Sequence, residues 1–169
     1  SDVCSSDLLL SIENLQVHFR TPEGVNRAVD GVSFAIGAGE TLAIVGESGC
    51  GKSLTALGIM GLLPPAAFYA GGSLRFEDRD ILELPEAGRR TLRGREMGMV
   101  FQDPMQYLNP VLTCGEQVSE PLRVLDGQSR SPARRRALEL FREVGLPDPD
   151  RQMERYPHEL SGGMRQRVL

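Results

Sequence analysis

The stretch Gly46-Glu47-Ser48-Gly49-Cys50-Gly51-Lys52-Ser53 decides the fold of this 169-residue chain. It has the form G-x-x-x-x-G-K-S, in which the glycines let backbone N–H groups curl around phosphate oxygens. Lys52 is the only lysine in the sequence, and the other strongly basic side chains are arginines. A lysine carries a compact ammonium on a flexible stem, whereas the arginine fork is planar and bulkier. The pattern therefore predicts a phosphate-binding loop in which Lys52 contacts β- and γ-phosphate oxygens.

The segments on either side give this loop its expected setting. The run from 40 to 45, Glu-Thr-Leu-Ala-Ile-Val, is short, apolar and partly β-branched, which is typical of a buried strand. After the loop, apolar residues recur at helical spacing until Pro64-Pro65, namely Leu54, Leu57, Met60 and Leu63. Strand, glycine loop and helix in this order predict an α/β nucleotide-binding core.

The same motif supplies the candidate ligands of a magnesium nucleotide. Backbone N–H groups of the loop and of the helix start, as far as Leu54, would hold the phosphates. Ser53 would offer a hydroxyl to Mg²⁺. Cys50 lies near a helix N-terminus, where a thiolate is favoured, and the alternative for this residue is a buried, inert thiol.

Composition narrows the class of protein. A net charge of −4 provides no global basic field for nucleic acid. No apolar run approaches the roughly 20 residues that cross a bilayer, and no secretory signal peptide is visible. Three cysteines at unrelated spacings predict neither a disulfide framework nor a zinc site. We therefore expect a cytoplasmic, reduced protein.

Residues 1–8 have no periodicity and join abruptly to a strand pattern. They resemble translated adapter read-through at the end of a gene fragment, and we expect them to be a non-native leader that is left out of fold reasoning. The alternative is a native frayed terminus. The domain itself is then expected over 9–169.

Turn formers and apolar alternation predict the other elements. Strands are expected over 9–19, 28–36, 71–76 and 97–101, with a turn at 21–24. From about residue 103 the pattern favours helices. One begins at Ser131-Pro132, as N-cap and first-turn proline, and ends at Gly145. A short segment then begins at Asp148.

A second glycine motif, Leu160-Ser161-Gly162-Gly163-Met164-Arg165-Gln166-Arg167, follows this helical region. Ser161 is a suitable N-cap for a helix whose first turn holds two glycines. Each glycine destabilises a helix interior by roughly 1 kcal/mol relative to alanine. A helix start that must let phosphate oxygens approach its N–H groups does need them. The motif therefore predicts a second phosphate contact.

The phosphate loop, Gln102 after an apolar run, and the stretch 160–167, in that order, make the chain resemble the nucleotide-binding subunit of an ABC transporter. The resemblance covers 8–169. Three segments are similar to the ATPases of dipeptide, oligopeptide and nickel importers: Val100-Phe101-Gln102-Asp103-Pro104-Met105, Leu108-Asn109-Pro110, and Tyr156-Pro157-His158-Glu159-Leu160-Ser161-Gly162-Gly163-Met164. Gln106-Tyr107 departs from the smaller residues usual there.

This resemblance implies a P-loop NTPase with a RecA-like core, an N-terminal antiparallel β subdomain and a helical signature subdomain over about 103–165. It implies that Lys52 and Ser53 hold the phosphates and Mg²⁺ of ATP, and that Gln102 contacts Mg²⁺ or the attacking water. Ser161, Gly162 and Gly163 would bind the γ-phosphate held by a second subunit. Phe19 would stack on adenine, with His18 and Phe34 as rivals, and His158 would be structural.

The resemblance also implies partners and a location. Asp103 to about Leu125 would face the permease subunits of a bacterial importer, a second ATPase subunit would complete a homo- or heterodimer, and a solute-binding protein would act indirectly. The protein would lie peripherally on the cytoplasmic face of the inner membrane, without nucleic acid. The transported solute, peptide or nickel, is not encoded in this subunit.

The family pattern continues beyond 169 with an Asp-Glu strand end and a switch histidine, so we expect a chain truncated after the signature helix start. Such a piece would bind Mg-ATP without turning it over. Two alternatives stay open. A soluble ABC ATPase of DNA repair or translation would need basic surfaces or zinc modules. A small P-loop kinase would need a lid and an acceptor site, and its reaction would not require the motif at residues 160–167.

Overall fold

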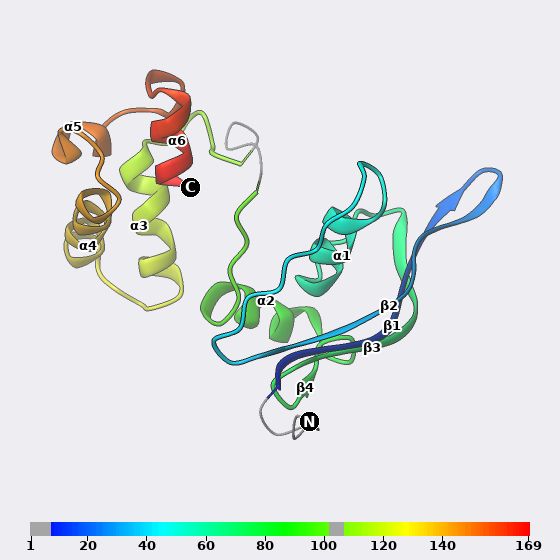
Figure 1. Cartoon of the computed structure of the whole chain (residues 1–169). Coiled ribbons are helices and arrows are strands. Elements are labelled where there is room, and N and C mark those ends of the chain that lie inside the picture. Colours follow the sequence, from blue (N-terminus) through cyan, green and yellow to red (C-terminus); the bar gives the residue numbers. More distant parts are fainter. Residues whose placement is uncertain (1–7, 102–106) are drawn as a thin grey trace. The chain divides into compact units, whose positions relative to one another are not determined.

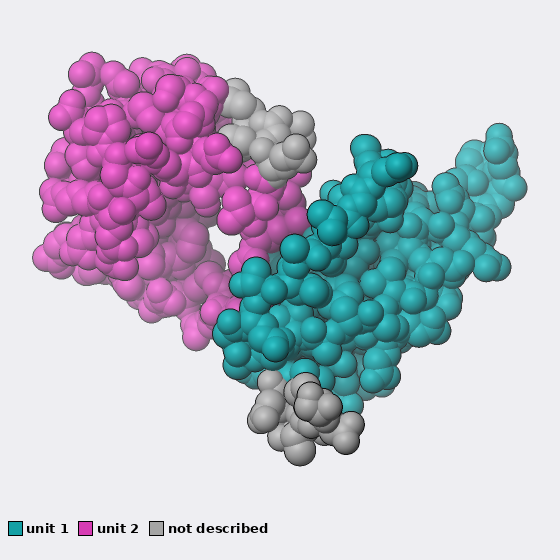
Figure 2. Space-filling view, in the orientation of Figure 1, with its two compact units in different colours: residues 1–93 teal, residues 94–169 magenta. Residues whose placement is uncertain are grey.

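The structure of the protein is a computed structural model that describes residues 8–101 and 107–169. The chain divides into two compact units, residues 1–93 and 94–169, which are described here one at a time (Figure 2).

The first unit is built on a four-stranded antiparallel sheet in the order β2-β1-β3-β4 (Figure 1). Its strands are β1 (Leu8–Thr21), β2 (Gly24–Gly37), β3 (Ala67–Phe76) and β4 (Arg79–Asp80). The predicted N-terminal antiparallel sheet is confirmed, with longer strands than the pattern indicated. Leu8, which we placed in the leader, is the first residue of β1 and pairs with Gly37. Residues 1–7 lie outside the described part of the chain.

A β-bulge in β1 explains why its apolar alternation is only approximate. Leu10 and Ile12 are buried, and so are Leu15 and Val17, although the two pairs are out of phase by one residue. The register shifts between Ile12 and Leu15 against β2, and between Glu13 and Gln16 against β3. Side chains alternate with a period of two, so one extra residue in a strand turns every later side chain to the opposite face from the one it would otherwise have. All four side chains therefore reach one core.

Helix α1 (Lys52–Ile59) follows the phosphate loop directly, as predicted, and α2 (Glu86–Arg95) buries Leu92. The buried residues of α1 are Thr55 and Gly58, so the expected leucine stripe is not what seats this helix. Met60, just after it, is buried.

Two predicted strands are wrong. Residues 40–45 and 97–101 form no strand, and within them Val45 is 92% exposed and Val100 is 75% exposed. A buried strand requires hydrogen-bonded neighbours along its edges. None of the strands in the described part of the chain pairs with either segment. An apolar sequence alone therefore does not make a strand here.

The second unit is helical from residue 114 onward. It contains α3 (Cys114–Val124), α4 (Arg130–Glu143), α5 (Pro149–Met153), the 3₁₀ helix η3 (Pro157–Glu159) and α6 (Gly162–Val168). These elements enclose a hydrophobic core, made of Cys114, Ala137, Phe141, Leu146, Met153 and Leu160. Burial, with a smaller contribution from Glu159, raises the pKa of Cys114 to about 11.

The ends of α4 show which capping predictions hold. The N-cap is Ser129 and not Ser131, and its side chain makes no capping hydrogen bond. Pro132 lies in the first turn of the helix, as expected. At the other end Gly145 has φ +66°. The Gly145 N–H donates to Arg142 O and the Leu146 N–H to Phe141 O, both at 3.0 Å. These two hydrogen bonds form a Schellman motif. The motif needs a residue in the left-handed conformation, which explains the glycine at this position.

Among the described residues, no helix has both the length and the apolar character that spanning a membrane requires.

Candidate phosphate-binding site

The phosphate loop holds its lysine inward. The Lys52 ammonium donates to the carbonyl oxygens of Gly46 at 2.8 Å and Glu47 at 2.6 Å, and its nitrogen lies 3.5 Å from the sulfur of Cys50. The loop therefore curls around the Lys52 ammonium, which satisfies two of the loop's carbonyl oxygens. The motif predicts that this lysine reaches β- and γ-phosphate oxygens when a nucleotide is bound.

Two glycines of the loop lie close to other groups, and Gly51 occupies a position that favours no other residue. A Cβ on Gly51 would lie 2.7 Å from the carbonyl oxygen of Ala28 on β2, and the residue has φ +91°. A Cβ on Gly46 would lie 2.8 Å from the sulfur of Cys50. Close backbone approach and a left-handed conformation both select glycine. The first contact fixes the loop against the sheet, and the second keeps its turn tight.

The start of α1 presents N–H groups that no side chain caps. Its N-cap is Gly51, which offers no side-chain acceptor. Thr55 is the first residue of the helix whose N–H is satisfied within it, by donating to Gly51 O at 2.8 Å. The N–H groups before it carry the positive end of the helix dipole, which favours anions. Ser53 is exposed beside them. These residues fit a polyphosphate, with a hydroxyl available for Mg²⁺.

Side chains that the sequence analysis missed seat α1 on the sheet. The Tyr69 hydroxyl donates to the carbonyl of Gly58 at 2.5 Å, and Val17 packs on the same glycine. Arg93 donates to the carbonyl of Met60 at 3.2 Å, at the C-terminal end of the helix. Burial raises the pKa of Tyr69, and the charges of Arg89 and Arg93 partly oppose this. No sequence signal marks these contacts, because they join segments far apart in the chain.

The sheet register separates Phe19 from one of its rivals. Val17 pairs with Tyr69 and Val29, and this row faces α1, since Tyr69 bonds to Gly58 and Val29 lies against Gly51. Side chains alternate along a strand, so Phe19, two residues after Val17, also faces α1, and the residue between Val17 and Phe19 points away from it.

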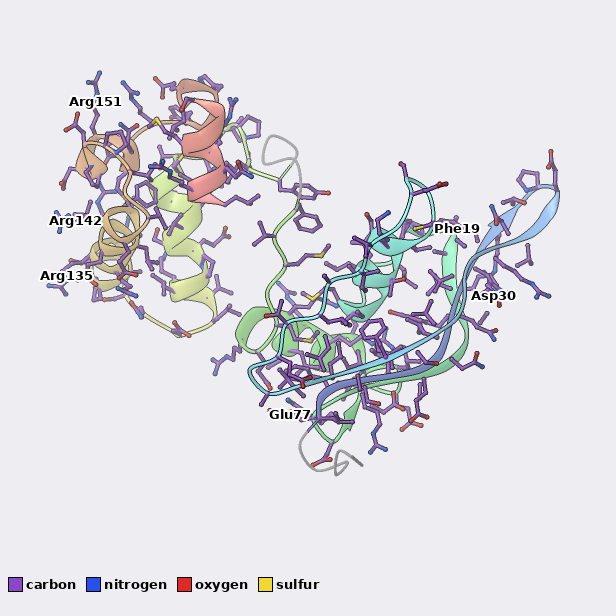
Figure 3. All side chains as sticks on the ribbon, viewed as in Figure 1. Phe19, Asp30, Glu77, Arg135, Arg142 and Arg151 are labelled. Carbon is purple, nitrogen blue, oxygen red and sulfur yellow. The ribbon has the colours of Figure 1, made fainter. Side chains whose placement is uncertain are left out.

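The residue that points away is His18. Its ring packs edge-on against Phe68 with centroids 6.0 Å apart, and Arg20 lies over the same Phe68 ring at 5.0 Å. Phe34, the other rival, pairs with Ile12 on the far side of the bulge. Phe19 is half-buried and, as Figure 3 shows, lies beside the loop that enters α1.

The second glycine motif lies in the helical unit. Ser161 is the N-cap of α6, and its hydroxyl accepts from the N–H of Met164 at 3.4 Å. Gly162 and Gly163 are exposed, and a Cβ on Gly163 would meet nothing within 4 Å. Packing therefore does not require a glycine there. Arg167 holds α6 to the end of α4 by donating to Gly145 O at 2.7 Å.

Some of the predicted site residues are brought together and others are not. The loop residues and the helix start share one unit with Phe19: Gly46, Glu47, Ser48, Gly49, Cys50, Gly51, Lys52, Ser53 and Leu54. Ser161, Gly162 and Gly163 belong to the other unit. Gln102 and Asp103 lie outside the described residues, and His158 forms part of η3 with its ring stacked on Tyr156 at 5.7 Å.

Comparison with known proteins identifies the family of this chain. A family model for ABC transporters matches residues 29–169. The chain belongs to the ABC transporter family. The match includes the phosphate loop, Gln102 and the Ser161 motif, the three features on which the resemblance was based.

The relatives of this ABC chain are named for peptide transport. It is 49% identical over 165 residues to the probable peptide ABC transporter ATP-binding protein y4tR of Sinorhizobium fredii, covering 97% of this chain and 49% of the relative. It is 48% identical to the dipeptide transport ATP-binding protein DppD of Bacillus subtilis, covering 95% and 48%. The oligopeptide transport protein OppD of the same organism is 46% identical, with 95% and 45% covered. The ABC chain thus spans about half the length of these relatives.

A solved structure supports the ABC fold. The chain superposes on the ATP-binding cassette MJ0796, bound to ADP and Pi in a dimeric post-hydrolysis state, with a TM-score of 0.81 and 29% identity. The superposition covers 94% of this chain and 66% of that one. The α/β fold of an ABC ATPase cassette, predicted from the motifs, is confirmed.

Proposed function

We propose that this chain binds Mg-ATP as part of the ATPase subunit of a bacterial peptide importer. The observation that carries the proposal is the phosphate loop, in which Lys52 is held by loop carbonyls at the uncapped start of α1. Membership of the ABC family supports ATP as the nucleotide. The names of the relatives support peptide transport.

The roles of the chain's own groups follow from their chemistry. Lys52 exchanges loop carbonyls for β- and γ-phosphate oxygens, and the N–H groups of the loop and of Ser53 and Leu54 bind the same anion. Ser53 places its hydroxyl at Mg²⁺, which when bound neutralises charge that builds up on the phosphates. Phe19 stacks on adenine, since it shares the α1 face of the sheet.

Groups outside this unit complete the proposal. Gln102 contacts Mg²⁺ or the attacking water, and Ser161, Gly162 and Gly163 bind the γ-phosphate of a nucleotide held by a second subunit. The stretch from Asp103 to about Leu125 meets the permease subunits at the cytoplasmic face of the inner membrane. A solute-binding protein delivers the peptide to those permeases and does not touch this chain.

Of the alternatives, nickel import keeps every role above and changes only the solute. A soluble ABC ATPase of DNA repair or translation is not favoured, because the relatives are named for peptide transport. A P-loop kinase has no use for the Ser161 motif.

The test is Lys52→Ala. Charge-assisted hydrogen bonds contribute roughly 1.5–3 kcal/mol each, so losing the ammonium should weaken Mg-ATP binding by about tenfold or more. Titration with a fluorescent ATP analogue measures this. If Lys52→Ala and the parent protein bound Mg-ATP with equal affinity, the proposal would be overturned.

Arg27→Ala is the matched control for charge. Arg27 also carries one positive charge in this unit, but it is exposed and pairs with Asp30 at 3.6 Å, away from the loop. We expect it to change the affinity for Mg-ATP by less than about twofold. A loss in Arg27→Ala as large as that in Lys52→Ala would mean that net charge alone governs binding.

A further inference from the structure

Three strands place their side chains in one row across the face that carries the phosphate loop. Phe19 on β1 pairs with Asn26 on β2 and with Ala67 on β3. Directly opposed residues on neighbouring strands project to the same face, with Cβ atoms roughly 5 Å apart. Across this row, the aromatic ring of Phe19 therefore lies between the small side chain of Ala67 and the amide of Asn26.

An irregularity in β2 puts the amide on this face. Val17 pairs with Val29 but the next residue, His18, pairs with Arg27, so Ala28 is an extra residue in β2. Without that extra residue, Asn26 would point to the opposite face, because the side-chain period is two. The carbonyl of Ala28 is also the group that lies against Gly51. One bulge thus both supports the phosphate loop and turns Asn26 toward the same side.

The amide of Asn26 is not committed to the fold. Asn26 is exposed, and among residues 8–101 and 107–169 its side chain makes no hydrogen bond. It is not a turn residue either, since the hairpin turns between Thr21 and Gly24. Ala67, on the other side of Phe19, is too small to cover the ring. The amide and the ring are consequently both available to a flat, polar-edged ligand.

We propose that Asn26 recognises the edge of the adenine base that stacks on Phe19, which makes it a specificity-determining residue for the nucleotide. This inference rests on the proposed function. An asparagine amide offers one donor and one acceptor side by side. At its N7 edge adenine offers the complementary pair, the acceptor N7 beside the donor N6 amine.

Guanine does not match the same amide at this edge. Its N7 and O6 are both acceptors, so an amide that faces the N7 edge satisfies only one of them. Discrimination should be moderate, because Asn26 is exposed and water competes for its hydrogen bonds. We expect a preference for ATP over GTP of about three- to tenfold to depend on this side chain.

The experiment is competition of ATP and of GTP, each with Mg²⁺, against a ribose-labelled fluorescent ATP, using the purified protein and Asn26→Ala. The variant should lower the ratio of ATP to GTP affinity by about three- to tenfold and leave the affinity for GTP nearly unchanged. An unchanged ratio would overturn the inference. So would an equal loss for both nucleotides, which would make Asn26 a support for the loop only.

Three further variants separate this inference from the proposed function. Lys52→Ala should weaken both nucleotides equally, and if it weakens neither, the proposed function itself fails. Phe19→Ala should also weaken both, because stacking does not depend on the base edge. Arg27→Ala alters the neighbouring residue on the opposite face and should leave the ratio unchanged. A shift in the ratio with Arg27→Ala as large as with Asn26→Ala would count against recognition by the amide.

Discussion

At the scale of single residues, the two thiols of the described chain have opposite environments. Cys50 is exposed in the phosphate loop, 3.5 Å from the Lys52 ammonium nitrogen. Cys114 is fully buried in the helical core, where its pKa is raised to about 11. Only a thiolate reacts quickly with electrophiles. Cys114 should therefore be inert below about pH 10, whereas Cys50 is exposed and accessible to a labelling reagent.

The corresponding prediction is maleimide labelling of Cys50 that Mg-ATP prevents. A phosphate held by the loop covers the thiol, so saturating Mg-ATP should slow labelling by about tenfold or more if occupancy exceeds nine-tenths. Mass spectrometry of a Cys4→Ser background measures the rate.

Cys50→Ser in the same background is the control and should leave no fast-labelling site, because Cys114 is the remaining thiol. Labelling of Cys50 at the same rate with and without saturating Mg-ATP would contradict the prediction.

At the scale of elements, the bulge in β1 depends on a glycine across the strand pair. Gly72 has φ +93°, and a Cβ there would lie 2.4 Å from the carbonyl oxygen of Asn14 and 2.6 Å from Cα of Leu15. Asn14 is itself left-handed, with φ +49°. Both atoms are backbone and cannot rotate aside. The bulge and Gly72 therefore form one unit of the sheet.

We predict that Gly72→Ala destabilises the sheet unit by about 2–4 kcal/mol, from backbone strain and the displaced strand. Urea unfolding followed by circular dichroism measures the change. Gly71→Ala is the matched control, since its Cβ would meet only the end of the Gln16 side chain, with the oxygen at 3.3 Å and Cδ at 3.5 Å. It should cost less than about 1 kcal/mol. Equal effects at the two glycines would show that the close approach is unimportant.

At the scale of the whole molecule, the phosphate loop and the Ser161 motif belong to different compact units. Each has a glycine at the start of a helix. In the proposed function they serve nucleotides in two different subunits, so that ATP lies between a loop of one chain and a Ser161 motif of the other. Assembly of two copies then depends on both nucleotide and motif.

We predict that a non-hydrolysable ATP analogue drives dimerisation and that Ser161→Arg weakens it by about tenfold or more. The larger side chain would fill the space where a γ-phosphate contacts the bare helix start. Light scattering measures the association.

Ser129→Arg is the matched control, because Ser129 is also an exposed N-cap in this unit but makes no capping bond. It should dimerise like the parent. Normal nucleotide-driven dimerisation of Ser161→Arg would contradict a shared site.

The sequence by itself determined what depends on local chemistry. The loop, the start of α1 and the glycine after α4 follow from residues that adopt left-handed or close-packed backbone, and those conformations are encoded residue by residue. The two glycine motifs, with Gln102 between them, predicted the family. Alternation predicted the two strands that became β1 and β2, with a turn between them, and the family resemblance implied that their sheet is antiparallel.

Only the tertiary structure decided which side chains meet. The bulges at Asn14 and Ala28 set the face to which Leu15, Phe19 and Asn26 point, and no local pattern announces an extra residue in a strand. Tyr69 and Arg93 reach α1 from distant segments. The apolar run at 40–45 is not a strand, because a strand exists only through the hydrogen bonds that its neighbours supply.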